Sequence, residues 1–219
     1  MSFGDYIKIV RSNTNVNQTQ MARILDISRT AIKLIENGST KYPSKKVLKN
    51  LSSYLNKPEI EVMSRILFTD VNFDKQSTDK LCSYRYLTHM YLEGWNIDQA
   101  PYRYFVSENY YHDFEGRIIK KRQPKNIAIV SGFTQFLSRI DDFKSANDAL
   151  VYMGDAMAIA SSVLDEFRNV HIIFDYNNID QKQKFEYFRN LQYRTRSFGI
   201  IFILYDASKD QIIDEVKYK

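Results

Sequence analysis

Residues 16–43 read VNQTQMARILDISRTAIKLIENGSTKYP, and this stretch decides how the first part of the chain folds. Its apolar residues recur at spacings of three, four and seven, as they do along one face of a helix. They are Met21, Ala22, Leu25, Ile27, Ile32 and Ile35. The spacing predicts two short helices whose apolar stripes share one small core.

A tight turn is expected between these helices, at residues 25–28. Asp26 falls where the chain must reverse quickly, and aspartate adopts a left-handed backbone more readily than most other non-glycine residues. Ser28 has the position of an N-cap, whose hydroxyl accepts a backbone N–H of the second helix. Asn37 and Gly38 are expected to end that helix, because glycine accepts a positive φ.

The outward residues of the second helix suit contact with DNA. With Ile32 and Ile35 facing the core, four polar residues project from the cap and the first turns, namely Ser28, Arg29, Thr30 and Lys33. This part of a recognition helix reaches base edges in the major groove. Arg29 can form two hydrogen bonds to a guanine, and Thr30 can bond a base or touch a thymine methyl. The residues alone also fit a helical hairpin with an ordinary solvated face.

Residues 16–43 resemble the helix-turn-helix of the Cro/repressor-type (XRE) family, and the loop ENGSTKYP at 36–43 is close to that of lambdoid phage repressors. The resemblance implies base contacts from Ser28, Arg29, Thr30, Lys33 and Leu34. It implies backbone contacts from Gln18, which would also brace the recognition helix, and from Asn37, Ser39, Thr40 and Lys41. Two positions depart from the family pattern. Asp26 stands where glycine is common, and Thr19-Gln20 where acidic residues are frequent.

Residues 1–68 have the size and pattern of a five-helix, lambda-repressor-like DNA-binding domain. A first helix is expected before the polar break at residues 12–15. Pro43 and Pro58 mark the starts of a fourth and a fifth helix, where a missing N–H costs little. Lys45, Lys46 and Lys49 follow the loop, and we expect at least one of them, Lys45 first, to contact phosphate.

The basic residues are unevenly distributed. Residues 1–68 carry eleven Lys and Arg against five Asp and Glu, whereas residues 69–219 carry twenty against twenty-one. The whole basic excess therefore lies in the segment that resembles a DNA-binding domain. A charge serving only solubility has no reason to be divided in this way, but a module that faces phosphates does.

The composition indicates a globular cytoplasmic protein. Seven glycines and four prolines in 219 residues argue against low complexity, and no apolar run approaches the roughly 18 residues of a membrane span. The first residues have no apolar signal core. Cys82 is the only cysteine, so a disulfide within the chain is impossible and a reducing compartment is expected.

Residues 69–78 are polar and are predicted to be a linker, followed by an α/β domain at residues 79–219. Helices are expected at about 81–93, 143–167 and 181–194, and strands at 102–111, 117–120, 126–130, 170–174, 199–205 and 212–218. The order α-β-β-β-α-β at its start is that of restriction-endonuclease-like folds. An inactive relative of that fold is therefore one expectation for this domain.

Nuclease chemistry in that fold needs an aspartate on one strand and a Glu-x-Lys or Asp-x-Lys on the next, which together hold Mg²⁺. Asp113 and Glu115 lie near the first expected strands, but the strand at 126–130 has neither a carboxylate nor a lysine. Glu215-Val216-Lys217 spells the triplet, with Asp206 upstream. We expect Glu215 and Lys217 to form the solvated side of an edge strand instead.

No enzyme, metal site or cofactor is expected. His89, His112 and His171 lack the spacing of metal ligands, and glycine-rich phosphate-binding motifs are absent. The sequence thus predicts a transcriptional regulator, a phage or mobile-element repressor, that binds operator DNA as a homodimer through its second domain. Three alternatives stay open: an antitoxin or immunity component whose second domain binds a protein, a sensor of a small-molecule effector, and a DNA-targeted nuclease.

Overall fold

The computed structural model describes residues 2–68, 71–97, 102–107, 110–120, 123–133, 143–163, 168–191 and 199–218. The chain divides into two compact units, Met1–Lys75 and Gln76–Lys219. We call them the N-terminal unit and the C-terminal unit and describe each by itself. The division between them falls inside the segment 69–78 that the sequence predicts to be a linker.

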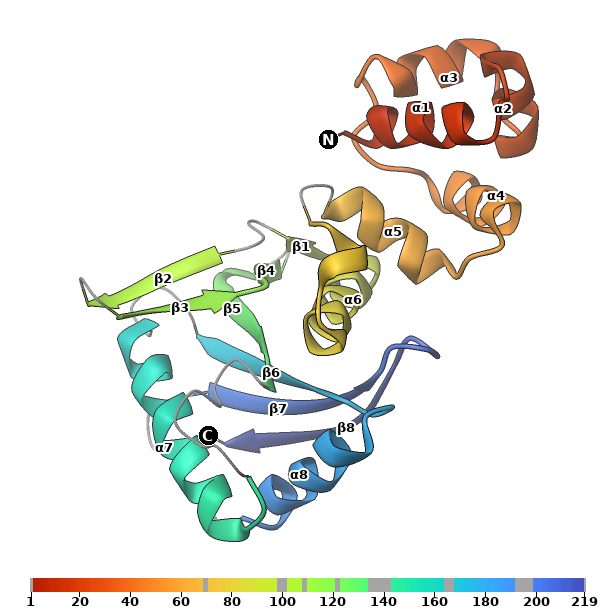
Figure 1. Cartoon of the computed structure of the whole chain (residues 1–219). Helices are drawn as coiled ribbons and strands as arrows, with labels where there is room; N and C mark the ends of the chain where they lie inside the picture. The colour runs from red at the N-terminus through yellow and green to blue at the C-terminus, as the bar shows by residue number, and fades with distance from the viewer. Residues whose placement is uncertain are drawn as a thin grey trace. The chain divides into compact units, whose positions relative to one another are not determined.

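The N-terminal unit folds as five helices followed by one short 3-10 turn (Figure 1). The helices are α1 (Phe3–Asn13), α2 (Gln18–Leu25), α3 (Arg29–Glu36), α4 (Lys45–Leu55) and α5 (Glu59–Leu67), and the turn is η1 (Phe73–Lys75). The number and order of the helices agree with the sequence prediction.

Local hydrogen bonds explain why α2 and α3 begin where they do. Asn17 and Gln20 form a capping box, in which each side chain accepts the other residue's backbone N–H, at 2.9 and 2.8 Å. The Ser28 hydroxyl accepts the N–H of Ala31 at 3.0 Å. Asp26 ends α2 in the left-handed conformation with φ of 52°. The predicted turn and cap are therefore confirmed.

The helices of this unit share one core. The inward residues predicted for α2 and α3 are buried, namely Met21, Ala22, Leu25, Ile32 and Ile35. Helix α1 packs closely against α3, because a Cβ at Gly4 would lie only 2.2 Å from the carbonyl oxygen of Ile35. Only glycine fits at this contact, and it fixes the distance between the two helices.

The C-terminal unit is built on a mixed six-stranded sheet with the order β1-β4-β5-β6-β7-β8. The strands are β1 (Trp95–Ile97), β4 (Gly116–Lys120), β5 (Gln123–Gly132), β6 (Asn169–Asp175), β7 (Gly199–Asp206) and β8 (Gln211–Tyr218). Strands β5, β6 and β7 are parallel to one another, and the other neighbours are antiparallel. A separate hairpin, β2 (Tyr102–Ser107) and β3 (Tyr110–Phe114), interrupts the chain between β1 and β4.

Helices cover both faces of this sheet (Figure 1). Helix α6 (Thr78–Leu92) precedes β1, while α7 (Ala146–Val163) and α8 (Ile179–Asn190) connect the parallel strands β5 to β6 and β6 to β7. Alternate residues of β6 face opposite sides of the sheet. Ile172 and Phe174 join the core that includes α7 and α8, whereas the ring of His171 contacts Tyr86 of α6.

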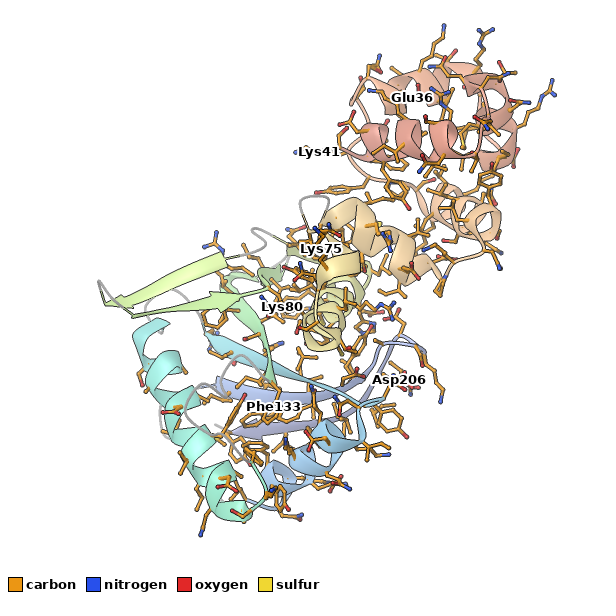
Figure 2. All side chains as sticks on the ribbon, viewed as in Figure 1. Glu36, Lys41, Lys75, Lys80, Phe133 and Asp206 are labelled. Atoms are coloured by element: carbon orange, nitrogen blue, oxygen red, sulfur yellow. The ribbon has the colours of Figure 1, made fainter. Side chains whose placement is uncertain are left out.

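The core between the sheet and the pair α7 and α8 is strongly aromatic. It contains Phe133, Phe143, Tyr152, Phe174, Phe185, Phe188 and Phe202, all buried. The rings of Phe133 and Phe174 stack with their centroids 4.3 Å apart, and those of Phe188 and Phe202 at 4.4 Å. Figure 2 labels Phe133 in the C-terminal unit. Aromatic side chains bury large apolar areas, so this core contributes strongly to the stability of the unit.

Two parts of the sequence prediction for this unit are wrong. The segment 102–111 is not one strand, because Ser107 pairs with Tyr110 and the chain forms the β2–β3 hairpin there. Strand β1 was not predicted, since its three residues follow directly on the end of α6. The predicted strands near 117–120, 126–130, 170–174, 199–205 and 212–218 correspond to β4, β5, β6, β7 and β8.

The long helices start at residues that capping determines. Helix α7 begins at Ala146 rather than near 143, because the Asp148 carboxylate accepts the N–H groups of Lys144 and Ser145. Helix α8 begins at Ile179 because Asn178 caps it. Residues 164–167 and 192–194 of the predicted helices lie outside the described ranges.

In the part of the chain that the structure describes, no helix combines the length and apolarity that a membrane crossing requires.

Candidate nucleic-acid interface

Helix α3 turns one side to the core and the opposite side to solvent. Ile32, Ile35 and Glu36 are buried. Thr30 and Leu34 lie one turn apart on the outward side, since residues four apart share a helix face. The five residues predicted to contact bases are all exposed, and they are Ser28, Arg29, Thr30, Lys33 and Leu34. The structure thus brings them together along the solvent-facing side of α3.

A buried carboxylate holds the far end of α3 in place. Glu36 is only 7% exposed, and its two oxygens accept hydrogen bonds from Arg11 of α1 at 2.5 and 3.2 Å. Gln18, the first residue of α2, donates its amide to the same carboxylate at 2.6 Å. Arg11 also donates to the carbonyl of Val16. We call these contacts the Glu36 brace, because they join α1, α2 and α3. Figure 2 labels Glu36 in the N-terminal unit.

The charge on Glu36 is stabilised despite its burial. Burial raises the pKa of Glu36, but the hydrogen bonds from Arg11 and Gln18 and the positive charge of Arg11 outweigh it, so that the pKa lies below its ordinary value. The carboxylate is therefore ionised at neutral pH and fully bonded. The resemblance implied a bracing role for Gln18, and the hydrogen bond to Glu36 is of that kind. The part played by Arg11 was not predicted.

The residues predicted to contact the DNA backbone surround the end of α3. Asn37, Ser39 and Lys41 are exposed and Thr40 is half-buried. Gly38 has φ of +82°, which allows the chain to leave the helix and form this loop. Figure 2 shows Lys41 at the edge of the N-terminal unit. Gln18 is half-buried and is already engaged with Glu36.

The lysines after the loop differ in their surroundings. Lys45, Lys46 and Lys49 are all exposed on α4. Lys46 forms an ion pair with Asp26 at 2.6 Å, and both side chains are solvent-exposed. Exposed pairs of this kind contribute little to stability, so Lys46 can exchange this partner for a phosphate at small cost.

The carboxylates weighed for metal chemistry in the C-terminal unit do not come together. Asp206 lies at the end of β7, opposite Gln211, and Glu215 lies opposite Ile203 further along β8. Glu215 is four residues beyond Gln211 on β8, which corresponds to about 13 Å along the strand. Asp206 is buried, and hydrogen bonds from Ser208 and Asn177 outweigh its burial and lower its pKa to about 2. Glu215 is exposed and pairs with Lys217.

The other candidates for catalysis have structural contacts where they are described. Glu115 is buried, and its carboxylate accepts the N–H of Gly132 at 3.0 Å. His171 is bonded to the hydroxyl of Tyr86 at 2.8 Å, and His89 to Asp210 at 2.9 Å. The side chains of Asp113 and His112 lie outside the described part. Among the described residues, no three His, Cys, Asp or Glu side chains are grouped so that they could hold a metal ion.

Comparison with known protein families identifies the N-terminal unit. Residues 4–66 match a family model described as "Helix-turn-helix domain". These residues form a helix-turn-helix domain, consistent with the XRE type, and the C-terminal region of mixed sheet and helices follows it. No curated protein and no solved structure matches the chain.

Proposed function

We propose that this protein is a sequence-specific transcriptional regulator that reads an operator in double-stranded DNA through α3. The observation that carries the proposal is the solvent-facing side of α3, which presents Arg29, Thr30 and Lys33 on a helix held in place by the Glu36 brace. Recognition helices of this motif present such residues to base edges in the major groove. A fixed helix also loses little freedom on binding, which favours affinity.

The residues divide into two roles. Arg29, Thr30 and Lys33, together with Ser28 and Leu34, would contact bases and set the sequence preference. The loop residues Asn37, Ser39, Thr40 and Lys41, with Lys45 and Gln18, would contact the DNA backbone and add affinity without sequence information. The net basic charge of residues 1–68 supports the second role, because the phosphate backbone attracts it.

We propose further that the protein acts as a homodimer through its C-terminal unit. One small recognition helix gives limited specificity, whereas two on a twofold axis read half-sites about one helical turn apart. From the family resemblance we expect a cytoplasmic repressor encoded by a phage or mobile element.

For the C-terminal unit we propose a non-catalytic relative of the restriction-endonuclease-like fold. The sheet supports this, because the order α6-β1-β4-β5-α7-β6 repeats α-β-β-β-α-β once the β2–β3 hairpin is treated as an insertion. Strand β5, where the Glu-x-Lys would stand in an active enzyme, contains no carboxylate. The unit would then dimerise the protein or bind an effector, with no cofactor and no reaction of its own.

A salt-titrated binding assay tests the proposal. The full chain is titrated onto DNA from just upstream of its own coding region and onto a scrambled duplex, with and without Mg²⁺. We expect tight binding to the first duplex at physiological salt and no cleavage. Weak, salt-sensitive binding to both duplexes would refute sequence-specific regulation, and Mg²⁺-dependent cutting would refute the non-catalytic assignment.

Two variants separate the proposed roles. Arg29→Ala should weaken binding to the specific site by about 1–3 kcal/mol and relax the preference at one base pair. Lys41→Ala should weaken binding to all sequences about equally and reduce the salt slope by about 1. If Arg29→Ala binds its operator as tightly as the native chain, α3 is not the recognition helix.

A further inference from the structure

Strand β8 forms one edge of the six-stranded sheet (Figure 1). Its eight residues pair with β7 on one side, and no other strand in the described part of the chain pairs with its outer side. The opposite edge is β1, which has only three residues. Strand β8 therefore presents a row of backbone N–H and C=O groups that is long enough to receive a further strand.

A backbone N–H of β8 is bonded to a side chain instead of a strand. The N–H of Glu215 donates to the carboxylate of Asp214 at 2.8 Å. Short polar side chains can bond nearby backbone groups in this way and compete with the bonds of a sheet. Such a local bond is easily exchanged for the carbonyl of an added strand.

The exposed side of β8 carries charges of opposite sign. Its exposed residues are Gln211, Ile213, Glu215 and Lys217, and they alternate with residues that are buried or partly buried. Glu215 and Lys217 form an ion pair, and their side chains are 44% and 45% exposed. Charges of one sign keep two edges apart, because like charges meet when two copies approach. Opposite charges two residues apart can instead complement each other between copies.

The charges favour one register for pairing β8 with the β8 of a second copy. Antiparallel pairing of identical strands has a twofold axis, which passes through one residue position. Centred on Asp214, Glu215 or Lys217, it places two like charges opposite each other at the axis. Centred nearer the β7–β8 turn, it leaves both Lys217 side chains outside the paired residues. Centred on Val216, it places Glu215 opposite Lys217 of the second copy, twice by symmetry, and facing charges of opposite sign stabilise antiparallel strands.

We propose that β8 pairs antiparallel with β8 of a second copy about Val216, so that two six-stranded sheets become one continuous sheet. This inference rests on the proposed function, which supplies the homodimer, and it names the surface that forms it. Glu215 and Lys217 exchange their partner within the chain for one in the other copy. The backbone bonds of the two edges therefore supply the affinity, and the charges select the register.

Charge reversal in the full chain tests the pairing, with the dimer Kd measured by analytical ultracentrifugation. Glu215→Lys sets two lysines opposite each other at two places and should weaken the dimer about tenfold or more. Lys217→Glu should do the same with two glutamates. The double variant with both reversals should restore the dimer, since opposite charges face each other again. Glu93→Lys is the matched control, because it reverses an exposed charge at the end of α6, and it should dimerise like the native chain.

A disulfide between the copies tests the register. Val216→Cys places two thiols opposite each other at the twofold axis, so oxidation should link the two chains. Ile213→Cys places the thiols about 20 Å apart along the paired strands and should not link them. Cys82, the only native cysteine, is buried and should give no link in the native chain.

The outcomes separate the inference from the proposed function. If the full chain is monomeric at concentrations at which it binds its operator, the homodimer and the β8 pairing both fail. If the chain is dimeric but neither single reversal changes its Kd, only the β8 pairing is overturned, and another surface forms the dimer. The register is wrong if the double variant stays as weak as the single ones, or if Ile213→Cys is linked and Val216→Cys is not.

Discussion

The two units are stabilised by different kinds of contact. In the N-terminal unit, a buried charge joins three helices, and the helix ends are closed by side-chain caps. In the C-terminal unit, stacked aromatic rings fill the space between a sheet and two helices. The polar network joins α3, the proposed recognition helix, to α1 and α2, whereas the aromatic core fills the space between the sheet and two helices. Damage to the first unit should therefore affect DNA binding, and damage to the second should affect folding.

The largest expected effect comes from the aromatic core. Phe188→Ala removes a fully buried ring that stacks on Phe202 and should lower the free energy of unfolding of the C-terminal unit by about 4 kcal/mol. Trp95 is the only tryptophan and lies in β1, so its fluorescence reports this unit. Circular dichroism reports both units. If Phe188→Ala shifted every transition equally, the two units would unfold as one.

The second largest expected effect is a loss of stability of the C-terminal unit in acid. Burial, aided by the positive charge of Lys217, lowers the pKa of His171 from 6.5 to about 4. Between these values the unfolded chain binds a proton that the folded chain does not, so stability is lost as the pH falls from 6.5 to 4, by up to about 3 kcal/mol. The fluorescence of Trp95 should follow this loss. His171→Gln should abolish the slope in that window.

The N-terminal unit should respond to acid in a lower range. It contains no histidine, and the pKa of Glu36 lies below its ordinary 4.5. The stability that Glu36 contributes is present above pH 4.5 and is lost as the pH falls below that value. A loss of helix content in this unit that began near pH 6.5 would contradict the assignment of the earlier loss to His171.

Breaking the Glu36 brace should have a smaller effect on stability and a direct effect on binding. Glu36→Gln leaves the guanidinium of Arg11 without its charge partner and should cost the N-terminal unit about 2 kcal/mol, less than a fully buried pair because Arg11 is partly exposed. Thermal unfolding followed by circular dichroism measures this. Specific DNA binding should weaken as well. Glu59→Gln, at an exposed position of α5, is the matched control and should change neither.

The smallest expected effect is a stabilising one, from a substitution in α7. Gly154 lies in the middle of α7, and a Cβ there would meet no atom within 4 Å. Gly154→Ala should therefore raise the stability of the C-terminal unit by about 1 kcal/mol, measured through Trp95. Gly4→Ala should have the opposite sign in the N-terminal unit, because its Cβ would collide with the carbonyl of Ile35. Destabilisation by Gly154→Ala would show that something else packs against this helix.

The sequence predicted the N-terminal unit well because its signals are local. The apolar spacing of α2 and α3, the cap at Ser28 and the left-handed residue Asp26 all act within a few positions along the chain. The part of Arg11 in the Glu36 brace escaped prediction, since Arg11 and Glu36 are 25 residues apart and no local pattern connects them. An apolar groove beside Leu34 was missed for the same reason, as its lining includes residues of α1, α3, α4 and the loop between α3 and α4.

The C-terminal unit was predicted in its elements and not in its arrangement. Buried strands such as β6 and β7 are recognisable as apolar runs, but which strands pair, and in which direction, depends on contacts between distant segments. The reversal at Ser107 was hidden in a run rich in Tyr and Phe, which suits one long strand equally well. Strand β1 is too short to show alternation.

The parallel strands have a consequence for the order in which the chain folds as it is synthesised. The contacts of the helix-turn-helix join segments close in sequence, so this part can fold as soon as it leaves the ribosome. Strand β5 gains its neighbour β6 only after α7 has been made, and β6 gains β7 only after α8. The aromatic core therefore closes late. The helix-turn-helix can therefore form while the strands that complete the sheet are still being translated.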